Sequence, residues 1–97
     1  MEQYPLVSIV TPSFNSARYI ERAIESVLSQ DYPRIEYIVM DGASTDDTVA
    51  ILDRYGSRLR YVSTPDKGAS DAINKGFARS QGSILAWPDK SESPKAW

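Results

Sequence analysis

The stretch of sequence that decides the fold is Glu36-Tyr37-Ile38-Val39-Met40-Asp41-Gly42-Ala43-Ser44-Thr45-Asp46-Asp47-Thr48. Residues 38–40 are apolar on both faces, which is typical of a central strand in a parallel sheet that helices cover on both sides. Asp41 then falls at the carboxyl end of this strand, where open α/β sheets bind their ligands. A plainer interpretation treats Asp41 as a solvated loop residue, and these residues alone leave both open.

The turn after Asp41 predicts the start of a helix. Gly42 permits a tight turn, and Ser44 to Asp47 matches a Ser-x-x-Asp helix start. An acid in the first helical turn is favoured by the helix dipole. We therefore interpret Asp46 and Asp47 as capping acids rather than as ligands of a substrate or metal.

Composition restricts the class of protein. A chain of 97 residues is one small domain, and its 41% hydrophobic and 25% charged residues exclude a disordered or low-complexity class. The net charge of −2 without a basic run argues against nonspecific nucleic-acid binding and against a polybasic membrane surface. We expect a small-molecule partner and no nucleic acid.

Two residue types are missing from the whole sequence, cysteine and histidine. Disulfides, thiolate zinc sites and nucleophiles activated by histidine are thereby excluded within this chain, and any metal must be held by oxygen ligands. The first apolar run, residues 5–10, is too short for a transmembrane segment or a signal sequence. We expect a cytoplasmic protein, with peripheral membrane attachment left open.

Periodicity predicts strands and helices in alternation. The first strand should end at Thr11-Pro12, because Pro12 lacks the N–H donor of an interior strand. The first helix should have Asn15 or Ser16 as its N-cap, and Gly56 should follow the second helix as its C′ residue. The predicted strands are Leu6 to Val10, Ile35 to Asp41, the edge strand Leu59 to Ser63, and Ile84 to Trp87. The helices between them are predicted from residues spaced along one face. In the first helix these are Ile20, Ala23, Ile24, Val27 and Leu28, in the second Val49, Leu52 and Tyr55, and in the third Ala69, Ala72, Ile73, Gly76 and Phe77.

This order predicts an α/β fold with a doubly wound, mostly parallel sheet over residues 1–87 and an irregular tail over 88–97. Each crossover returns the chain to the same edge of the sheet, so four loops should converge there: Thr11 to Asn15, Asp41 to Ser44, Asp66 to Asp71, and Asp89. Carboxylates and hydroxyls at this rim suit hydrogen bonding to a sugar or a base. A G-x-G-x-x-G motif after the first strand and a Walker lysine are both missing, so dinucleotide and P-loop sites are unsupported.

Several separated motifs resemble the opening of family 2 glycosyltransferases with the GT-A fold. They are Val7-Ser8-Ile9-Val10-Thr11-Pro12-Ser13-Phe14-Asn15, Ala23-Ile24-Glu25-Ser26-Val27-Leu28-Ser29-Gln30, the stretch from Glu36 to Thr48, Pro65-Asp66-Lys67-Gly68 and Asp71-Ala72-Ile73-Asn74-Lys75-Gly76. The resemblance covers roughly residues 6–87. The motifs occur in the family's order, which makes the match specific.

The resemblance implies an inverting enzyme that transfers sugar from a nucleotide diphosphate donor, commonly a UDP-sugar, to an unknown sugar, lipid or polysaccharide acceptor. Mg or Mn would bridge the diphosphate. Pro12 and Phe14 would line the base pocket, Asp41 would accept a hydrogen bond from the base, and the loop from Asp66 to Asp71 would flank the nucleoside. The candidate nucleotide-binding residues are Thr11, Pro12, Phe14, Asn15, Asp41, Gly42, Ser44, Asp66, Gly68 and Asp71.

The sequence departs from the family's pattern after the fourth strand. Where the family has paired metal-binding acids, this chain reads Pro88-Asp89-Lys90-Ser91-Glu92, so Asp89 is the candidate metal ligand and we expect weak metal binding. The later half, which carries acceptor contacts and the general base in the family, is absent here. We therefore expect the chain to be the donor-binding part of an enzyme, inactive alone and without an assigned catalytic residue.

Two other functions are compatible with parts of the sequence. One is a non-catalytic nucleotide-binding or interaction domain with the same fold. The other is a receiver-like phosphoacceptor at Asp41, which is disfavoured because the first strand ends without the acidic pair that such a site needs. We also expect self-association through the fourth strand, an apolar edge that offers unpaired backbone groups to a second chain.

Overall fold

The chain is described by a computed structural model over residues 4–82 and 84–86. Within these residues the elements are β1 (Val7–Ser13), α1 (Ile20–Leu28), β2 (Ile35–Asp41), α2 (Thr48–Arg54), a short 3-10 turn η1 (Gly56–Arg58), β3 (Arg60–Ser63), α3 (Ala69–Arg79) and β4 (Ile84–Ala86). The predicted alternation of strands and helices is confirmed. Trp87, the expected tail and Asp89 lie outside the described residues.

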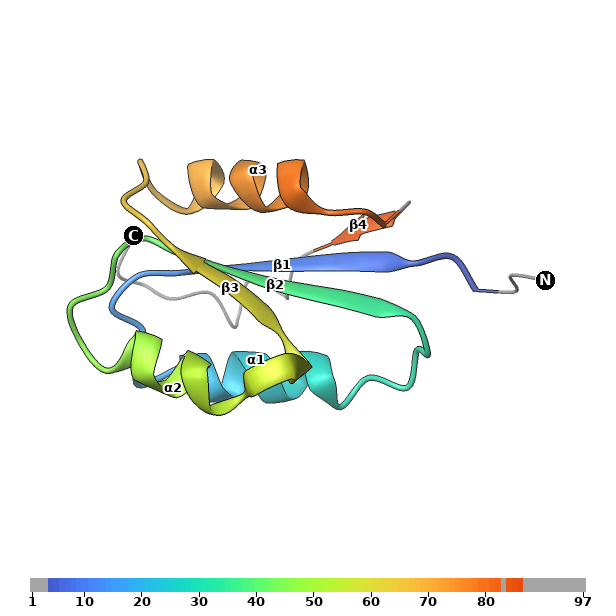
Figure 1. Ribbon diagram of the computed structural model, residues 1–97, viewed down its shortest axis with the longest axis horizontal. Coiled ribbons are helices and arrows are strands. Elements are labelled where there is room, and N and C mark those ends of the chain that lie inside the picture. Colours follow the sequence, from blue (N-terminus) through green and yellow to red (C-terminus); the bar gives the residue numbers. More distant parts are fainter. Residues whose placement is uncertain (1–3, 83, 87–97) are drawn as a thin grey trace.

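The described strands form one parallel sheet in the order β3-β2-β1-β4. Helices α1 and α2 lie on one face of the sheet and α3 lies on the other (Figure 1). The predicted α/β fold is therefore confirmed, and β3 is an edge strand as expected. Self-association through β4 stays a prediction.

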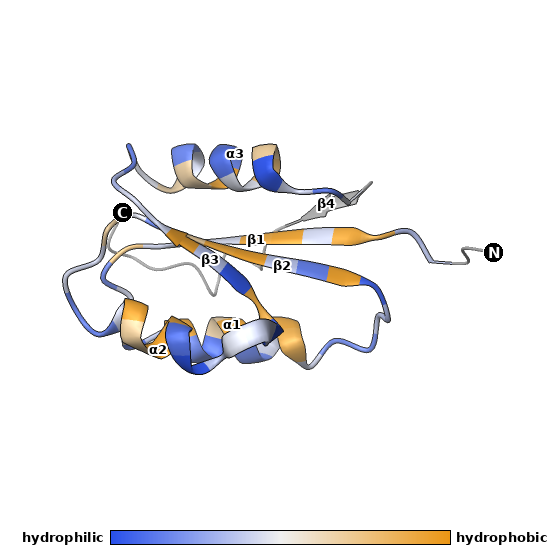
Figure 2. Ribbon diagram, in the orientation of Figure 1, coloured by the Kyte–Doolittle hydropathy of each residue, from blue (hydrophilic) through white to orange (hydrophobic). Residues whose placement is uncertain are grey.

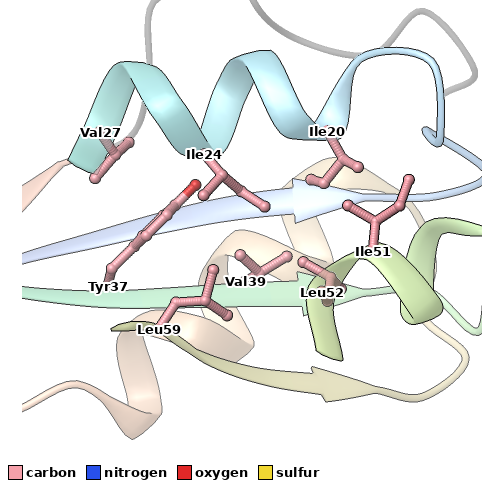
Figure 3. Close-up of a cluster of buried hydrophobic side chains, with 8 residues drawn as sticks. All are labelled: Ile20, Ile24, Val27, Tyr37, Val39, Ile51, Leu52 and Leu59. Carbon is pink, nitrogen blue, oxygen red and sulfur yellow. The ribbon is translucent and has the colours of Figure 1, made fainter. Parts of the chain in front are cut away.

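The larger apolar cluster lies between the sheet and the α1–α2 layer. Every third or fourth residue of α1 is buried, as a helix with one apolar face requires, and these residues meet alternate residues of β2. Figure 3 shows the side chains pointing toward one another; they are Ile20, Ile24, Val27, Tyr37, Val39, Ile51, Leu52 and Leu59. Hydrophobic residues lie along β1 and β2, while the connecting loops are mainly hydrophilic (Figure 2).

A smaller apolar cluster lies under α3. It joins Val10, Ile38, Met40 and Ala72. Gly76 lets α3 approach closely, because a Cβ at that position would lie 2.4 Å from Cγ1 of Val10. Both faces of β2 are thus buried, which explains its continuous apolar run.

The first strand is longer than the sequence predicted. It continues through Pro12 to Ser13, so the expected end at Thr11-Pro12 is wrong. Ser13 directs its carbonyl toward β2, where it accepts the N–H of Gly42 at 2.8 Å, so Pro12 faces the other side of the strand. On that side the described residues of β4 pair with Val7–Ile9 of β1, and among the residues that the structure describes no ladder hydrogen bond needs an N–H at Pro12.

The first helix starts later than predicted. Its N-cap residue is Tyr19, without a side-chain capping bond, so neither Asn15 nor Ser16 is the N-cap. Both residues are engaged elsewhere: the Asn15 amide oxygen accepts the N–H of Thr45 at 2.8 Å, and the Ser16 hydroxyl bonds to backbone atoms of Phe14. For Asn15, a contact with a loop 30 residues away has replaced the expected local cap, whereas the Ser16 hydroxyl is used within its own loop.

The second helix ends as predicted. Gly56 follows its C-cap residue with φ of 56°, the left-handed conformation that glycine adopts without strain. Its start is displaced, because α2 begins at Thr48 and the predicted Ser-x-x-Asp start at Ser44 is wrong. Asp46 does cap the helix, since its Oδ1 accepts the Thr48 N–H at 3.0 Å. The buried residues of α2 are Thr48, Ile51 and Leu52.

Candidate functional site

The carboxyl ends of β1, β2 and β3 meet at one rim, as parallel strands require. Asp41 is the central residue of this rim and is only 1% exposed. Its Oδ1 accepts the hydroxyls of Ser13 and Ser44, both at 2.6 Å. Its Oδ2 accepts the Ser44 N–H and the Ser63 hydroxyl, both at 2.8 Å.

These four hydrogen bonds use the acceptor capacity of a carboxylate, which has about four lone-pair sites. They join the end of β1, the β2–α2 loop and the end of β3. Asp41 is therefore neither the solvated loop residue nor the purely ligand-directed acid that the sequence suggested. It has a structural role that the sequence analysis missed, because its hydroxyl partners Ser13 and Ser63 are 28 and 22 residues away.

A second set of bonds fastens the β1–α1 loop to the β2–α2 loop. The Asn15 N–H donates to the Ser44 hydroxyl at 2.8 Å, and the Asn15 amide oxygen accepts the N–H groups of Thr45 and Asp46. Asn15 has φ of 48° and Ala43 has φ of 63°, a region that costs a residue with a Cβ about 1–2 kcal/mol. The hydrogen bonds hold these two residues in that conformation.

Asp46 completes this loop contact from the exposed side. Its carboxylate accepts the N–H of Ala17 at 3.1 Å as well as the Thr48 N–H and hydroxyl. Partial burial acts to raise the pKa of Asp46, but these donors outweigh it and hold the pKa below its ordinary value. The sequence-based interpretation of Asp46 as a capping acid is confirmed, since it accepts the Thr48 N–H. The same interpretation of Asp47 is wrong, because Asp47 stands at the N-cap position without a side-chain capping bond.

The β3–α3 loop brings another carboxylate to the rim. Asp66 is half-buried, and its Oδ1 accepts the Gly68 N–H at 3.0 Å. Gly68 has φ of 120°, which favours glycine. The backbone of Gly42 approaches Asp66 so closely that a Cβ on residue 42 would stand 2.9 Å from Asp66 Oδ2.

Asp71 lies in the first turn of α3. Its carboxylate accepts the Lys67 N–H at 3.0 Å and pairs with the Lys75 ammonium at 3.2 Å. The Lys67 N–H, followed by Lys75, lowers the pKa of Asp71. Asp71 therefore braces the loop that carries Asp66.

Not every candidate residue points to the rim surface. The Thr11 hydroxyl is buried and shares a 2.8 Å hydrogen bond with the Tyr37 hydroxyl inside the α1–α2 layer. Pro12 is buried as well, whereas Phe14 is half-buried and Asn15 is exposed. The structure brings together the loops of Phe14, Ser44 and Asp66 around Asp41. Thr11 lies away from the surface of the rim, in the buried layer beside Tyr37.

A protein-held metal does not fit the described residues, in which no three acidic side chains gather around a common point. A shallow hollow formed by described residues lies beside β3, lined by Leu52, Asp53, Gly56, Leu59, Arg60 and Tyr61, and contains none of the candidate residues. No helix of the described chain has the length and hydropathy needed to cross a membrane.

Comparisons with known proteins all indicate the same protein family. The family model described as glycosyl transferase family 2 matches residues 8–90. A putative teichuronic acid biosynthesis glycosyltransferase, TuaG of Bacillus subtilis, is 41% identical over 95 residues, which cover 94% of this chain and 38% of TuaG.

Solved structures agree with this match. The mannosyltransferase PcManGT of Pyrobaculum calidifontis, solved with GDP-Man and Mn2+, has a TM-score of 0.77 and 29% identity over 91% of this chain and 30% of its own. Glucosyl-3-phosphoglycerate synthase of Mycobacterium tuberculosis, solved with Mn2+, UDP and glucosyl-3-phosphoglycerate, has a TM-score of 0.72 and 31% identity over 88% of this chain and 33% of its own. The chain thus spans about a third of these proteins.

Proposed function

Because the chain belongs to glycosyl transferase family 2, we propose that it binds the nucleotide diphosphate sugar donor, a UDP-sugar, of an inverting glycosyl transfer. The observation that carries this proposal is the meeting of three loops at the carboxyl rim, held by the hydrogen bonds of Asp41. Ligands of open α/β sheets bind at this edge.

In this proposal the half-buried Phe14 lines the base pocket together with Pro12. The loop from Asp66 to Asp71 flanks the nucleoside, and Asn15, Gly42, Ser44 and Gly68 give the surrounding loops their shape. Asp41 acts chiefly by positioning, since its acceptor sites are already occupied. The acceptor and the general base are assigned to no residue of this chain.

A divalent cation would neutralise the charge on the diphosphate leaving group. The described residues do not fit such a cation, and Asp89, outside them, stays the candidate ligand. We therefore propose UDP binding that is weak and depends little on Mn.

Calorimetric titration of the chain with UDP, with and without Mn, tests the proposal. Phe14→Ala should weaken UDP binding, because stacking of a base on an aromatic ring is worth about 1–3 kcal/mol. Tyr19→Ala removes an exposed aromatic residue (46% exposed) that the proposed site does not use, and it should bind UDP like the parent chain. No UDP binding at millimolar concentration would refute the base pocket, and strong tightening by Mn would refute the weak metal site.

Catalysis by this chain alone is a separate proposal. We expect no release of UDP from a UDP-sugar in the presence of a mixture of acceptors, since transfer requires a positioned base that is not assigned here. Turnover that depends on an added acceptor would overturn this part without affecting donor binding.

A further inference from the structure

A line of polar side chains crosses the sheet on the face that α3 covers, near the amino ends of the strands. Ser8 of β1 and Glu36 of β2 are partners in the strand register, and the Ser8 hydroxyl donates to Glu36 Oε1 at 2.7 Å. Arg60 of β3 pairs with the other oxygen, Oε2, at 3.1 Å. Side chains alternate along a strand, so Ser8 shares its face with Val10 and Glu36 shares its face with Ile38, both in the cluster under α3.

The connection from α3 to β4 is fastened to this line. Helix α3 ends at Arg79, and the Gln81 N–H then donates to Glu36 Oε1 at 2.8 Å. The Gly82 N–H donates to the Ser8 hydroxyl at 2.8 Å. Ser8 is 0% exposed and the Glu36 side chain is 12% exposed, so water competes little for these bonds. Two consecutive N–H groups ahead of β4 are therefore held by side chains of β1 and β2.

The connection also lies directly against the backbone of the first strand. A Cβ built on Gly82 would overlap the Ser8 Oγ, and it would lie 2.7 Å from the Leu6 carbonyl oxygen and 2.8 Å from the Ser8 nitrogen. The last two atoms belong to the backbone, which cannot rotate aside as a side chain can. Any side chain at position 82 would therefore push the connection away from β1.

The ladder of β4 is short by comparison. Its described residues, Ile84–Ala86, pair with Val7–Ile9 of β1, whereas β1 and β2 pair from Val7 to Ser13. A slip of one residue would turn every side chain of a strand to the other face of the sheet. The hydrogen bonds of Gln81 and Gly82 oppose such a slip, because they fix the chain immediately before the strand begins.

We propose that Glu36 and Ser8 form a latch that docks β4 on β1 and sets its register, and that loss of the latch opens β4 while β1, β2 and β3 stay folded. Glu36 and Ser8 are then positioning residues, which act through the connection that they hold. The register of β4 decides where the chain reaches the carboxyl rim after this strand. The inference goes beyond donor binding, because the proposed donor contacts lie on the loops that follow β1, β2 and β3.

Amide hydrogen exchange of the whole chain, followed by NMR, tests the latch. Ser8→Ala removes the oxygen that links Glu36 to the Gly82 N–H, and Gly82→Ala keeps every polar group but separates them by overlap. In both variants the amides of β4 should exchange about tenfold or more faster than in the parent, while those of β2 keep their protection. Nuclear Overhauser contacts between β4 and its register partners in β1 should weaken.

A conservative pair of variants examines Glu36 in the same way. Glu36→Ala removes the acceptor of both the Ser8 hydroxyl and the Gln81 N–H, and it should open β4 as Ser8→Ala does. Glu36→Gln keeps one acceptor oxygen, so it should restore part of the protection of β4.

Gly56→Ala is the control for a general loss of stability. Gly56 has φ of 56° and no atom within 4 Å of a built Cβ, so alanine strains the backbone there without touching the latch. Exchange in this variant should rise to a similar degree in β2 and β4. A selective effect on β4 is therefore expected from the latch variants alone.

Each outcome decides the inference. Unprotected β4 amides in the parent, unchanged β4 exchange in Ser8→Ala, or equal acceleration in β2 and β4 would overturn the latch. The latch variants should also bind UDP like the parent chain, and loss of UDP binding by a folded variant would show that the rim depends on β4. A parent chain that binds no UDP would refute donor binding, while the exchange of β4 would still decide the latch.

Discussion

The hydroxyl of Ser13 donates a 2.6 Å hydrogen bond to the carboxylate of Asp41, and both side chains are buried. Replacing Asp41 by Ala would leave this hydroxyl, those of Ser44 and Ser63 and one backbone N–H without their acceptor. Leaving several donors of a buried network without their charged acceptor destabilises the fold by several times the contribution of a single neutral hydrogen bond. We expect Asp41→Ala to lower the free energy of unfolding by about 2–4 kcal/mol.

Urea denaturation measures this loss, and Asp41→Asn, which retains one acceptor oxygen, should lose less than Asp41→Ala. This expectation differs from the one that the sequence suggested, in which Asp41 accepts a hydrogen bond from the base of the ligand. An Asp41→Ala protein with an unchanged unfolding midpoint would show that the serine contacts contribute little.

The difference marks the limit of what periodicity reveals. Hydrophobic spacing predicted α1 and the buried strand β2, because burial of one helix face or of both strand faces leaves a pattern within a short window. The structural roles of Asp41 and Asn15 depend on hydrogen bonds to partners in other loops, which lie 22 to 31 residues away in sequence. The approach of Asp66 to Gly42 is likewise a tertiary contact, and a glycine in the sequence does not say which residue fills the space beside it.

Glu36 should make stability depend on acid pH. Its carboxylate accepts the Gln81 N–H at 2.8 Å and the Ser8 hydroxyl at 2.7 Å, and it pairs with Arg60 at 3.1 Å. Burial acts to raise the pKa of Glu36, but these partners outweigh it and hold the pKa below the ordinary 4.5. Since the folded state binds this proton less readily than the unfolded state, the contribution is complete above pH 4.5 and is lost as pH falls through the folded-state pKa.

Unfolding of Glu36→Gln measured from pH 7 to pH 3 checks this. The variant should be less stable at neutral pH, and its stability should fall less steeply in acid than that of the parent chain. Glu21→Gln removes an exposed acid of α1 and serves as the control. Parallel acid profiles for the parent and Glu36→Gln would contradict the assignment.

Gly76 should not tolerate a methyl group. A Cβ there would lie 2.4 Å from Cγ1 of Val10 and 2.9 Å from Cγ of Met40, both in the cluster under α3. Although alanine favours a helix over glycine, overpacking of this kind typically costs about 1–3 kcal/mol. Gly76→Ala should therefore lower the denaturation midpoint, while Asn74→Ala, on the exposed side of α3, should leave it unchanged or raise it. A Gly76→Ala protein more stable than its parent would mean that α3 moves away from the sheet at little cost.

The buried pair of Thr11 and Tyr37 offers a test by double-mutant cycle. Their hydroxyls lie 2.8 Å apart, and the side chains are 3% and 4% exposed. Tyr37→Phe or Thr11→Val alone leaves one buried hydroxyl unpaired, which costs about 1–3 kcal/mol. The double variant removes both hydroxyls, so its loss of stability should be smaller than the sum of the two single losses.

The same pair predicts an alkaline effect. Burial raises the pKa of Tyr37 to about 12, against an ordinary 10.0, although the Thr11 hydroxyl acts to lower it. The folded state therefore keeps this proton where the unfolded state loses it, so stability is complete below pH 10 and falls as pH rises toward 12. Tyr37→Phe should show a shallower fall over this range. Some slope should remain, because burial and the nearby Glu25 also raise the pKa of Tyr55 to about 12.

Strict additivity in the double-mutant cycle, together with an unchanged alkaline profile, would show that the hydroxyls of Thr11 and Tyr37 do not depend on each other.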